Sequence, residues 1–324
     1  MGFLKALFGG QEESPEEKKR KEDERNFDTL KYDGIRARRI GEFAHAVRCF
    51  QEALKIKHDD EIMEYMAEGL LICRQSDEGY ATYKKLAELH PGEIKYLITL
   101  AKLDEIRMNY TQMTKHCEEA LAIDSQNATA LYLSARSKYK QKDDLSAIIL
   151  LTQAITQDKT YTEAYLLRCE LLEKMGCLKE AEDTLDDILA CEHPAEEILM
   201  KKAHLCLRNQ KYEEAITYYN QVKETNPMIK GAYIGLSTAY SFNHQLDKAL
   251  STMNDVLDFM NDFAEGFKER GRIKLLLNDK EGAAEDLKQA LSINPKVASN
   301  IEGTFTNIEK EMNEQYKNRN PFGF

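Results

Sequence analysis

Small side chains return along this chain at a nearly constant spacing of 34 residues. One series, separated by 33 residues and then six times by 34, is Gly34, Ala67, Ala101, Ala135, Cys169, Ala203, Ser237 and Gly271. A second series, twelve residues further on, is Ala46, Gly79, Met113, Ala147, Ala181, Ala215, Ala249 and Ala283. A fixed period of about 34 residues is typical of stacked helical hairpins. The pattern therefore predicts an all-α repeat solenoid.

Bulky apolar residues occupy other positions of the same period. Eight units can be numbered from Phe27, Asp60, Ile94, Ala128, Thr162, Glu196, Lys230 and Ala264, and in them positions 4 and 24 are mostly Leu, Tyr, Phe or Met. A small residue at positions 8 and 20 lets two helices cross closely, because a larger one would overpack by roughly 1–3 kcal/mol. Large residues fill the grooves of the partner helix. We expect positions 4, 8, 20 and 24 to form the core of one continuous array.

Breaks in the helices follow the same register. Position 32 or 33 holds four of the six prolines, which are Pro91, Pro194, Pro227 and Pro295, and proline ends a helix at this point. Position 15 holds Gly41, Gly176 and Asn278, which accept the left-handed conformation that follows a helix. Each unit is therefore predicted to be two helices joined by a tight turn.

Taken together, small residues at 8 and 20, large ones at 4 and 24 and proline at 32 resemble the tetratricopeptide repeat family over residues 27–295. The resemblance implies a right-handed superhelix whose first helices line a concave peptide-binding groove with positions 2, 5, 9, 12 and 13. The groove residues that it implies are Tyr132, Arg136, Tyr139, Leu166, Glu170, Met200, His204, Leu207, Ile234 and Phe242. An aromatic and aliphatic strip suits an extended peptide or a helix. The alternative is that Leu166, Leu207 and Ile234 only pack between neighbouring helices.

One family function is testable residue by residue. Members that clamp the C-terminal carboxylate of a chaperone need Lys and Asn in one unit, Asn in the next, and Lys and Arg in the third. The first three units place Lys31, Ile35, Tyr65, Lys95 and Thr99 at those positions. We therefore expect no carboxylate clamp.

The two ends depart from the repeat. Residues 1–10 place Phe3, Leu4, Leu7 and Phe8 on one helical face, which favours either docking on a membrane or partner, or a tail folded on the first repeat. Residues 11–26 are predicted to be a charged helical spacer. Residues 296–317 are predicted to be a capping helix, followed by a tail at 318–324. The apolar face of that helix consists of Ile301, Phe305, Ile308, Met312 and Tyr316.

Charge and cysteine content limit the partners and the compartment. A net charge of −11 argues against nucleic acid, which needs a basic face. The charge is uneven, since residues 27–59 carry seven Lys and Arg against five Asp and Glu. The seven cysteines include no C-x-x-C pair, so we expect free thiols in a reducing compartment and a cytoplasmic protein. No long apolar run predicts a transmembrane helix.

No catalytic motif accompanies the repeats. The sequence has no Gly-rich phosphate loop, no nucleophile elbow and no His-Glu-x-x-His. We expect a non-enzymatic protein without cofactor or metal, acting as an adaptor that binds a peptide or a helix. The alternative is a peripheral membrane assembly factor tethered through Phe3, Leu4, Leu7 and Phe8.

Overall fold

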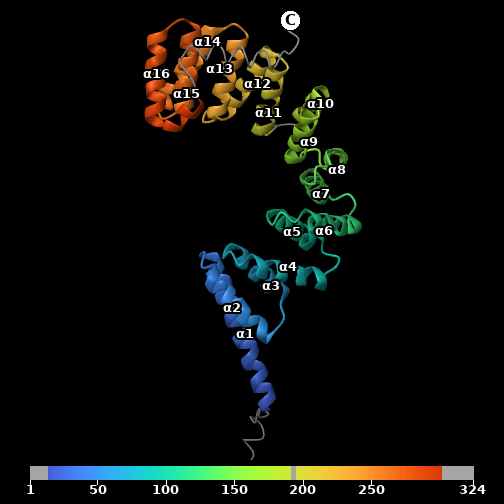
Figure 1. The fold of residues 1–324 in the computed structure, drawn as a ribbon. Helices are drawn as coiled ribbons and strands as arrows, with labels where there is room; N and C mark the ends of the chain where they lie inside the picture. The colour runs from blue at the N-terminus through green and yellow to red at the C-terminus, as the bar shows by residue number, and fades with distance from the viewer. Residues whose placement is uncertain (1–13, 191–194, 301–324) are drawn as a thin grey trace, which may run out of the picture. The chain divides into compact units, whose positions relative to one another are not determined.

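A computed structural model of the chain describes residues 14–190 and 195–300. In these two stretches the regular structure consists of sixteen α-helices and one short 3-10 helix, with no strand (Figure 1). The predicted all-α repeat fold is therefore confirmed. None of the described helices is both long and apolar enough to cross a bilayer.

Contacts divide the chain into two compact units, with the boundary between Asp158 and Lys159. Because a repeat contacts only its neighbours, such a division needs no break in the register. Unit 1 contains α1 (Pro15–Arg39), α2 (Phe43–Ile56), α3 (Asp60–Ile72), α4 (Ser76–Leu89), α5 (Ile94–Ile106), α6 (Tyr110–Ile123), α7 (Ala128–Lys140) and α8 (Asp144–Gln157). Unit 2 contains α9 (Thr162–Lys174), α10 (Leu178–Leu189), α11 (Glu196–Arg208), α12 (Tyr212–Thr225), α13 (Lys230–Phe242), α14 (Leu246–Phe259), α15 (Ala264–Leu276), α16 (Lys280–Ile293) and the 3-10 helix Pro295–Asn300.

Odd-numbered helices from α3 to α15 begin at the residues where the sequence places the starts of the second to eighth repeats. The first repeat differs, because α1 begins at Pro15 and runs without interruption through Phe27. Its start is fixed by a capping box, in which the Ser14 side chain accepts from the backbone of Glu17 and the Glu17 side chain accepts from the backbone of Ser14. The described part of the charged spacer is thus the first half of a repeat helix.

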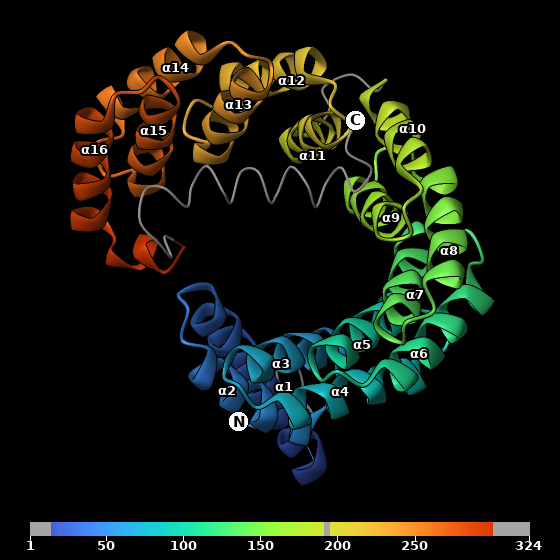
Figure 2. The ribbon, with the colours of Figure 1, turned by 45° about the horizontal axis from the view of Figure 1, so that its top comes forward.

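The small positions lie where the two helices of each hairpin cross. Every residue of both small series is buried, including Ala67, Ala135 and Cys169 at 0% exposure. At Gly34 the reason is visible, because a Cβ atom would lie 2.4 Å from the Phe50 ring. In each unit the odd-numbered helices form one layer and the even-numbered helices the other (Figure 2).

All eight hairpin turns share one backbone conformation at position 15. The residues there have φ between 56° and 83°, and they are Gly41, Arg74, Met108, Lys142, Gly176, Gln210, His244 and Asn278. The following amide donates to a carbonyl five residues back, as Glu42 does to Ala37 and Asn109 to Asp104. This pairing is the Schellman motif that closes a helix C-terminus. Sequence alone pointed to three of these eight left-handed residues.

At the C-terminal end, the structure describes only the first residues of the predicted capping helix. Residues 295–300, where the predicted capping helix begins, form a 3-10 helix, and Val297 packs against Ala264 and Ala290. The Asn294 side chain accepts a hydrogen bond from the Lys296 amide and so sets this turn. The rest of the predicted capping helix and the tail lie outside the described residues.

Candidate functional site

The predicted groove residues lie on four first helices. Tyr132, Arg136 and Tyr139 are on α7 in unit 1. The other seven are in unit 2, with Leu166 and Glu170 on α9, Met200, His204 and Leu207 on α11, and Ile234 and Phe242 on α13. Seven of the ten residues therefore lie on neighbouring helices of unit 2, and the other three lie on one helix of unit 1.

In unit 1, Arg136 is already paired. Its guanidinium lies 2.6 Å from Glu105 Oε1 on α5 and 5.7 Å from the centre of the Tyr132 ring. The ammonium group of Lys140 lies over the Tyr139 ring, 5.5 Å from the ring centre. Because the Arg136 charge is matched within the protein, a ligand would have to compete with Glu105 for it.

The same arrangement recurs between other first helices of unit 1. Arg38 on α1 lies 2.6 Å from Glu68 on α3, and Lys95 on α5 lies 2.6 Å from Glu64 on α3. Burial raises the pKa of Glu64, but hydrogen bonds from Lys95 and Tyr96 outweigh it and leave the pKa lowered. The first-helix layer of unit 1 therefore carries a row of ion pairs, in which each of these basic groups is paired with a carboxylate of the same layer.

These ion pairs were missed by the sequence reasoning, although a signal exists. The partners are separated by 30 residues for Arg38 and Glu68, and by 31 for Lys95 and Glu64 and for Arg136 and Glu105. Such pairing requires a basic residue and an acidic residue that lie about one repeat apart in the sequence. Because surface ion pairs contribute only ~0–1 kcal/mol each, they define the register more than they stabilise the fold.

The first helices of unit 2 present a more apolar surface. Leu166, Met200, Leu207 and Ile234 are each half-buried. Met200 and Leu207 pack at the margin of the core formed by α11, α12 and α13, and Ile234 packs at the margin of the next core cluster. Met200, Leu207 and Ile234 therefore contribute to packing between helices and still show part of their surface.

His204 is held as a neutral side chain at this surface. Its Nδ1 shares a hydrogen bond with the Tyr219 hydroxyl at 2.9 Å, and the two rings meet edge to face with centres 5.5 Å apart. Burial lowers the pKa of His204, and the nearby ammonium group of Lys201 lowers it further. The imidazole therefore adds an uncharged polar edge to the apolar strip at neutral pH.

Aromatic and charged groups complete the strip. Phe242 stacks on Tyr212 with ring centres 5.9 Å apart and an interplanar angle of 14°. Glu173 on α9 binds both Lys201, at 2.8 Å, and Arg208. The basic groups beside the apolar residues are thus neutralised within unit 2, whereas Glu170 is exposed.

One group of side chains in unit 2 has the composition of a metal site. Donor atoms of Glu182, Cys206 and Glu214 lie within 4.8 Å of one another. However, the same Glu182 oxygen is 2.5 Å from Lys211 Nζ and 3.3 Å from Lys202 Nζ. Burial raises the pKa of Cys206 to about 11, so its thiol is protonated at neutral pH. A metal ion would need a thiolate and a free carboxylate, and the cluster fits ion-pair packing instead.

A buried histidine–carboxylate pair in unit 1 was also absent from the sequence reasoning. His116 Nδ1 lies 2.7 Å from Asp104 Oδ2, and both side chains are at most 7% exposed. The other imidazole nitrogen lies 3.3 Å from the Gln112 side chain. Because both ring nitrogens are engaged inside the protein, this pair serves packing between α5 and α6 and offers no group to a substrate.

The four N-terminal apolar residues, Phe3, Leu4, Leu7 and Phe8, lie outside the described residues. Their predicted role in docking therefore stays a prediction.

A family model described as tetratricopeptide repeat matches residues 196–227 and 269–297. The chain is 22% identical over 256 residues to Hsp70-Hsp90 organizing protein 3 of Arabidopsis thaliana, covering 75% of this chain and 44% of that protein. It is 24% identical over 288 residues to the BBSome complex member BBS4 homolog of Drosophila melanogaster, covering 83% and 58%. The chain thus spans about half the length of these curated relatives.

Among solved structures, the chain is similar to the C-terminal part of a TPR repeat-containing protein from Cytophaga hutchinsonii. The TM-score is 0.61 at 15% identity, and the match covers 74% of this chain and 100% of the other. At this identity the similarity concerns the fold alone.

Proposed function

We propose that this chain, which a tetratricopeptide repeat model matches at residues 196–227 and 269–297, is a non-enzymatic adaptor that binds a peptide or a helix of another protein on the first helices of unit 2. The observation that carries this proposal is the strip of Met200, His204, Leu207, Ile234 and Phe242. These side chains come from two neighbouring helices, α11 and α13, and are half-buried or exposed.

Such a strip suits peptide binding for a physical reason. Leucine, isoleucine and methionine side chains that are already fixed by packing lose little entropy when a peptide covers them. The stacked Phe242 and the neutral His204 offer flat, preordered surfaces of the kind that carry much of the energy of an interface. Since Lys201 and Arg208 are matched by Glu173, binding would rely on apolar contact more than on capture of a charge.

The charge pattern also argues against a carboxylate clamp in unit 1. Lys31 bonds to Asp59 at 2.8 Å and to Glu61 at 3.0 Å, and Lys95 bonds to Glu64. The two lysines at clamp positions are therefore neutralised inside the chain. We therefore propose a peptide partner that is not held through a carboxylate clamp, although the Arabidopsis relative is named Hsp70-Hsp90 organizing protein 3.

The test begins with a peptide selected from a random display library on the immobilised protein. Its dissociation constant is measured by fluorescence polarisation for the wild type and for His204→Ala with Phe242→Ala. Loss of two central contacts is expected to weaken binding at least about tenfold, since hot-spot truncations cost ~1–2 kcal/mol or more each. The matched control is Thr217→Ala, an exposed position on the second-helix layer of unit 2.

The α7 group is tested in the same assay with Tyr132→Ala and Arg136→Ala. Equal loss from both double variants would extend the binding surface to α7. If neither double variant weakens binding while melting temperatures stay at the wild-type value, the first-helix layer is not the binding surface.

The membrane-tether alternative depends on Phe3, Leu4, Leu7 and Phe8. Their spacing on one face is the observation that favours it. Co-sedimentation with anionic liposomes, with and without residues 1–10, tests it. If both forms of the protein stay in the supernatant, the tether is excluded.

A further inference from the structure

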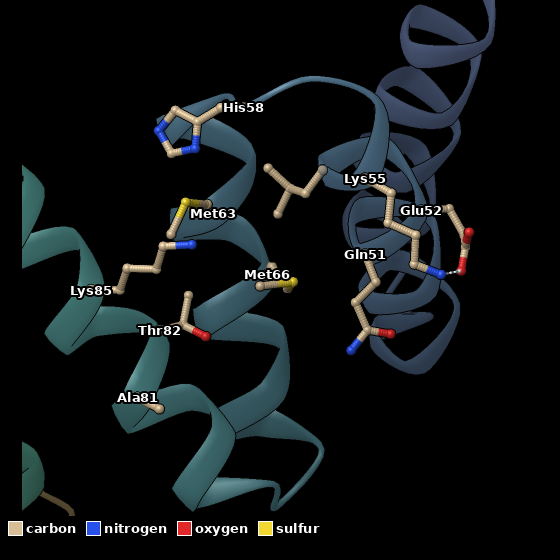
Figure 3. A pocket seen from close by; sticks show the side chains of 10 residues that line it. Gln51, Glu52, Lys55, His58, Met63, Met66, Ala81, Thr82 and Lys85 are labelled. Atoms are coloured by element: carbon tan, nitrogen blue, oxygen red, sulfur yellow. Dashed lines mark hydrogen bonds and ion pairs between the residues drawn. The ribbon is translucent and has the colours of Figure 1, made fainter. Parts of the chain in front are cut away.

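The surface of unit 1 is hollowed between α2 and α4, with α3 as the floor (Figure 3). The cleft has a volume of about 540 Å³, which lies within the range of ~300–1,000 Å³ typical of ligand sites. Its walls are the second helices α2 and α4, so most of its lining belongs to the second-helix layer of unit 1. It is therefore distinct from the peptide surface proposed above.

The lower part of the cleft is apolar. Leu54 from α2 and Met63 and Met66 from α3 line it. Met63 is only 3% exposed, whereas Met66 is half-buried. Methionine is flexible and polarisable, and it adapts to apolar side chains of different shapes.

The repeats differ in the residue that fills this position of the first helix. Met66 occupies position 7, and the residues at position 7 in four other repeats, Leu100, Ser134, Lys202 and Leu236, are at most 5% exposed. In the remaining three repeats, Asp33, Arg168 and Arg270 are not buried. In the junction between α10 and α12, the Lys202 ammonium group lies 2.6 Å from Asp186 at position 25 of the preceding repeat. In the first junction the corresponding residues are Met66 and Gln51. The ion pair that occupies the later junction is thus missing from the first one.

The rim of the cleft is basic. Lys55, His58 and Lys85 line it; Lys55 is paired with Glu52 at 2.6 Å, and His58 Nε2 lies 2.7 Å from Asp60 Oδ1. Lys85 extends from α4 toward Met63 (Figure 3), and no carboxylate pairs with it among the residues that the structure describes. The first repeat also carries seven basic against five acidic residues in a chain of net charge −11. An occupant that complements this site would be acidic at its edge and apolar at its centre.

We propose that this cleft docks an acidic peptide segment of another protein, with aliphatic anchor side chains placed on Met63 and Met66. The anchors remove methionine surface from water, and a carboxylate of the peptide pairs with Lys85 at the rim. The protein then has two binding surfaces, and the second one does not depend on the function proposed for unit 2.

The experiment uses a fluorescein-labelled helical peptide with leucines on one face and glutamates on the other. Its dissociation constant is measured by fluorescence polarisation with the full chain. Lys85→Glu is expected to weaken binding roughly tenfold, because it replaces an attraction by a repulsion. Lys84→Glu is the matched control, since Lys84 is exposed on the same helix but does not line the cleft, and it is expected to change binding little.

A second variant closes the cleft from inside. Gln51→Asp combined with Met66→Lys places the residues of the Asp186–Lys202 pair at the corresponding positions of the first junction. It is expected to abolish detectable binding while the far-UV circular dichroism spectrum stays unchanged. His204→Ala with Phe242→Ala is expected to leave the binding of this peptide unchanged, which separates this proposal from the one for unit 2.

Nuclear magnetic resonance of the protein with methyl-labelled methionine locates the binding site directly. The methyl signals of Met63 and Met66 are expected to shift on titration with the peptide, and the buried Met253 of unit 2 serves as the control. The proposal is overturned if Lys84→Glu and Lys85→Glu weaken binding equally, or if a peptide with lysines in place of the glutamates binds as well. Binding of anionic vesicles without binding of the peptide would also overturn it.

Discussion

Substitution of Met108 by glycine is expected to stabilise the protein, although it removes a side chain. Met108 stands at position 15 of the third repeat with φ of 56°, and its side chain is 75% exposed. A residue with a Cβ atom pays about 1–2 kcal/mol in the left-handed conformation. Glycine avoids that cost but loses about 0.4–1 kcal/mol more backbone entropy on folding. The difference predicts that Met108→Gly raises the free energy of unfolding by about 0.5–1 kcal/mol.

The opposite change in the first repeat isolates the same effect. Gly41 has φ of 83°, and a Cβ atom built there meets nothing within 4 Å. Gly41→Ala therefore introduces no steric contact, and its expected loss of about 0.5–1 kcal/mol arises from the backbone conformation alone. Met108→Ala keeps a Cβ atom at positive φ and is the control that separates the backbone effect from removal of the thioether.

Urea unfolding followed by far-UV circular dichroism measures these differences. Both sites lie in unit 1, so their transitions can be compared directly at an unchanged dependence on denaturant. Met108→Gly is expected to move the midpoint up, Gly41→Ala to move it down, and Met108→Ala to change it little. The reasoning is refuted if Met108→Gly and Met108→Ala give the same midpoint.

Three further predictions concern Cys117, His204 and Gly235. Burial raises the pKa of Cys117 to about 12, so maleimide labelling followed by mass spectrometry should modify the half-buried Cys73 much faster, and equal rates would contradict its burial. The pKa of His204 is lowered from 6.5. Its contribution to the free energy of unfolding is therefore complete at pH values above 6.5 and is lost as the pH falls through the lowered pKa. A midpoint at or above pH 6.5 in a nuclear magnetic resonance titration of His204 would contradict this. Gly235→Ala would place a Cβ atom 2.3 Å from the Tyr219 ring and should lower the free energy of unfolding by about 1–3 kcal/mol, whereas an unchanged urea midpoint would show that the ring moves freely.

The 34-residue periodicity predicted the fold well, because the packing of the helices imposes that periodicity on the sequence. Ala135 and Cys169 are buried at the crossings of helices for the reason that the spacing suggested, namely room for the partner backbone. The left-handed residues Arg74 and Met108 were not predictable in this way. The hairpin turn imposes their conformation. The hydrogen bonds of the Schellman motif outweigh the energetic cost that Arg or Met has in the left-handed conformation.

The candidate sites were predictable only in part. A repeat position indicates the helix face, and it places Met200 and Ile234 on the first-helix layer. It does not indicate whether a charge on that face is free, and Arg136 is matched by Glu105 from the preceding repeat. The cleft above Met66 was not predicted either. Gln51 and Met66 cannot form the ion pair that Asp186 and Lys202 form in the later junction, and this difference becomes visible only when the two junctions are compared in the structure.

Site-specific photo-crosslinking tests the central claim most directly. A photoreactive benzophenone amino acid replaces Met200 on the first-helix layer of unit 2, and in a second protein it replaces Thr217 on the second-helix layer. Each protein is irradiated in an extract of the cells that produce it, and the adducts are identified by mass spectrometry. The account predicts a discrete polypeptide adduct at Met200 that is absent at Thr217 and that excess selected peptide removes. Equal adducts at both positions, or none at Met200, would contradict it.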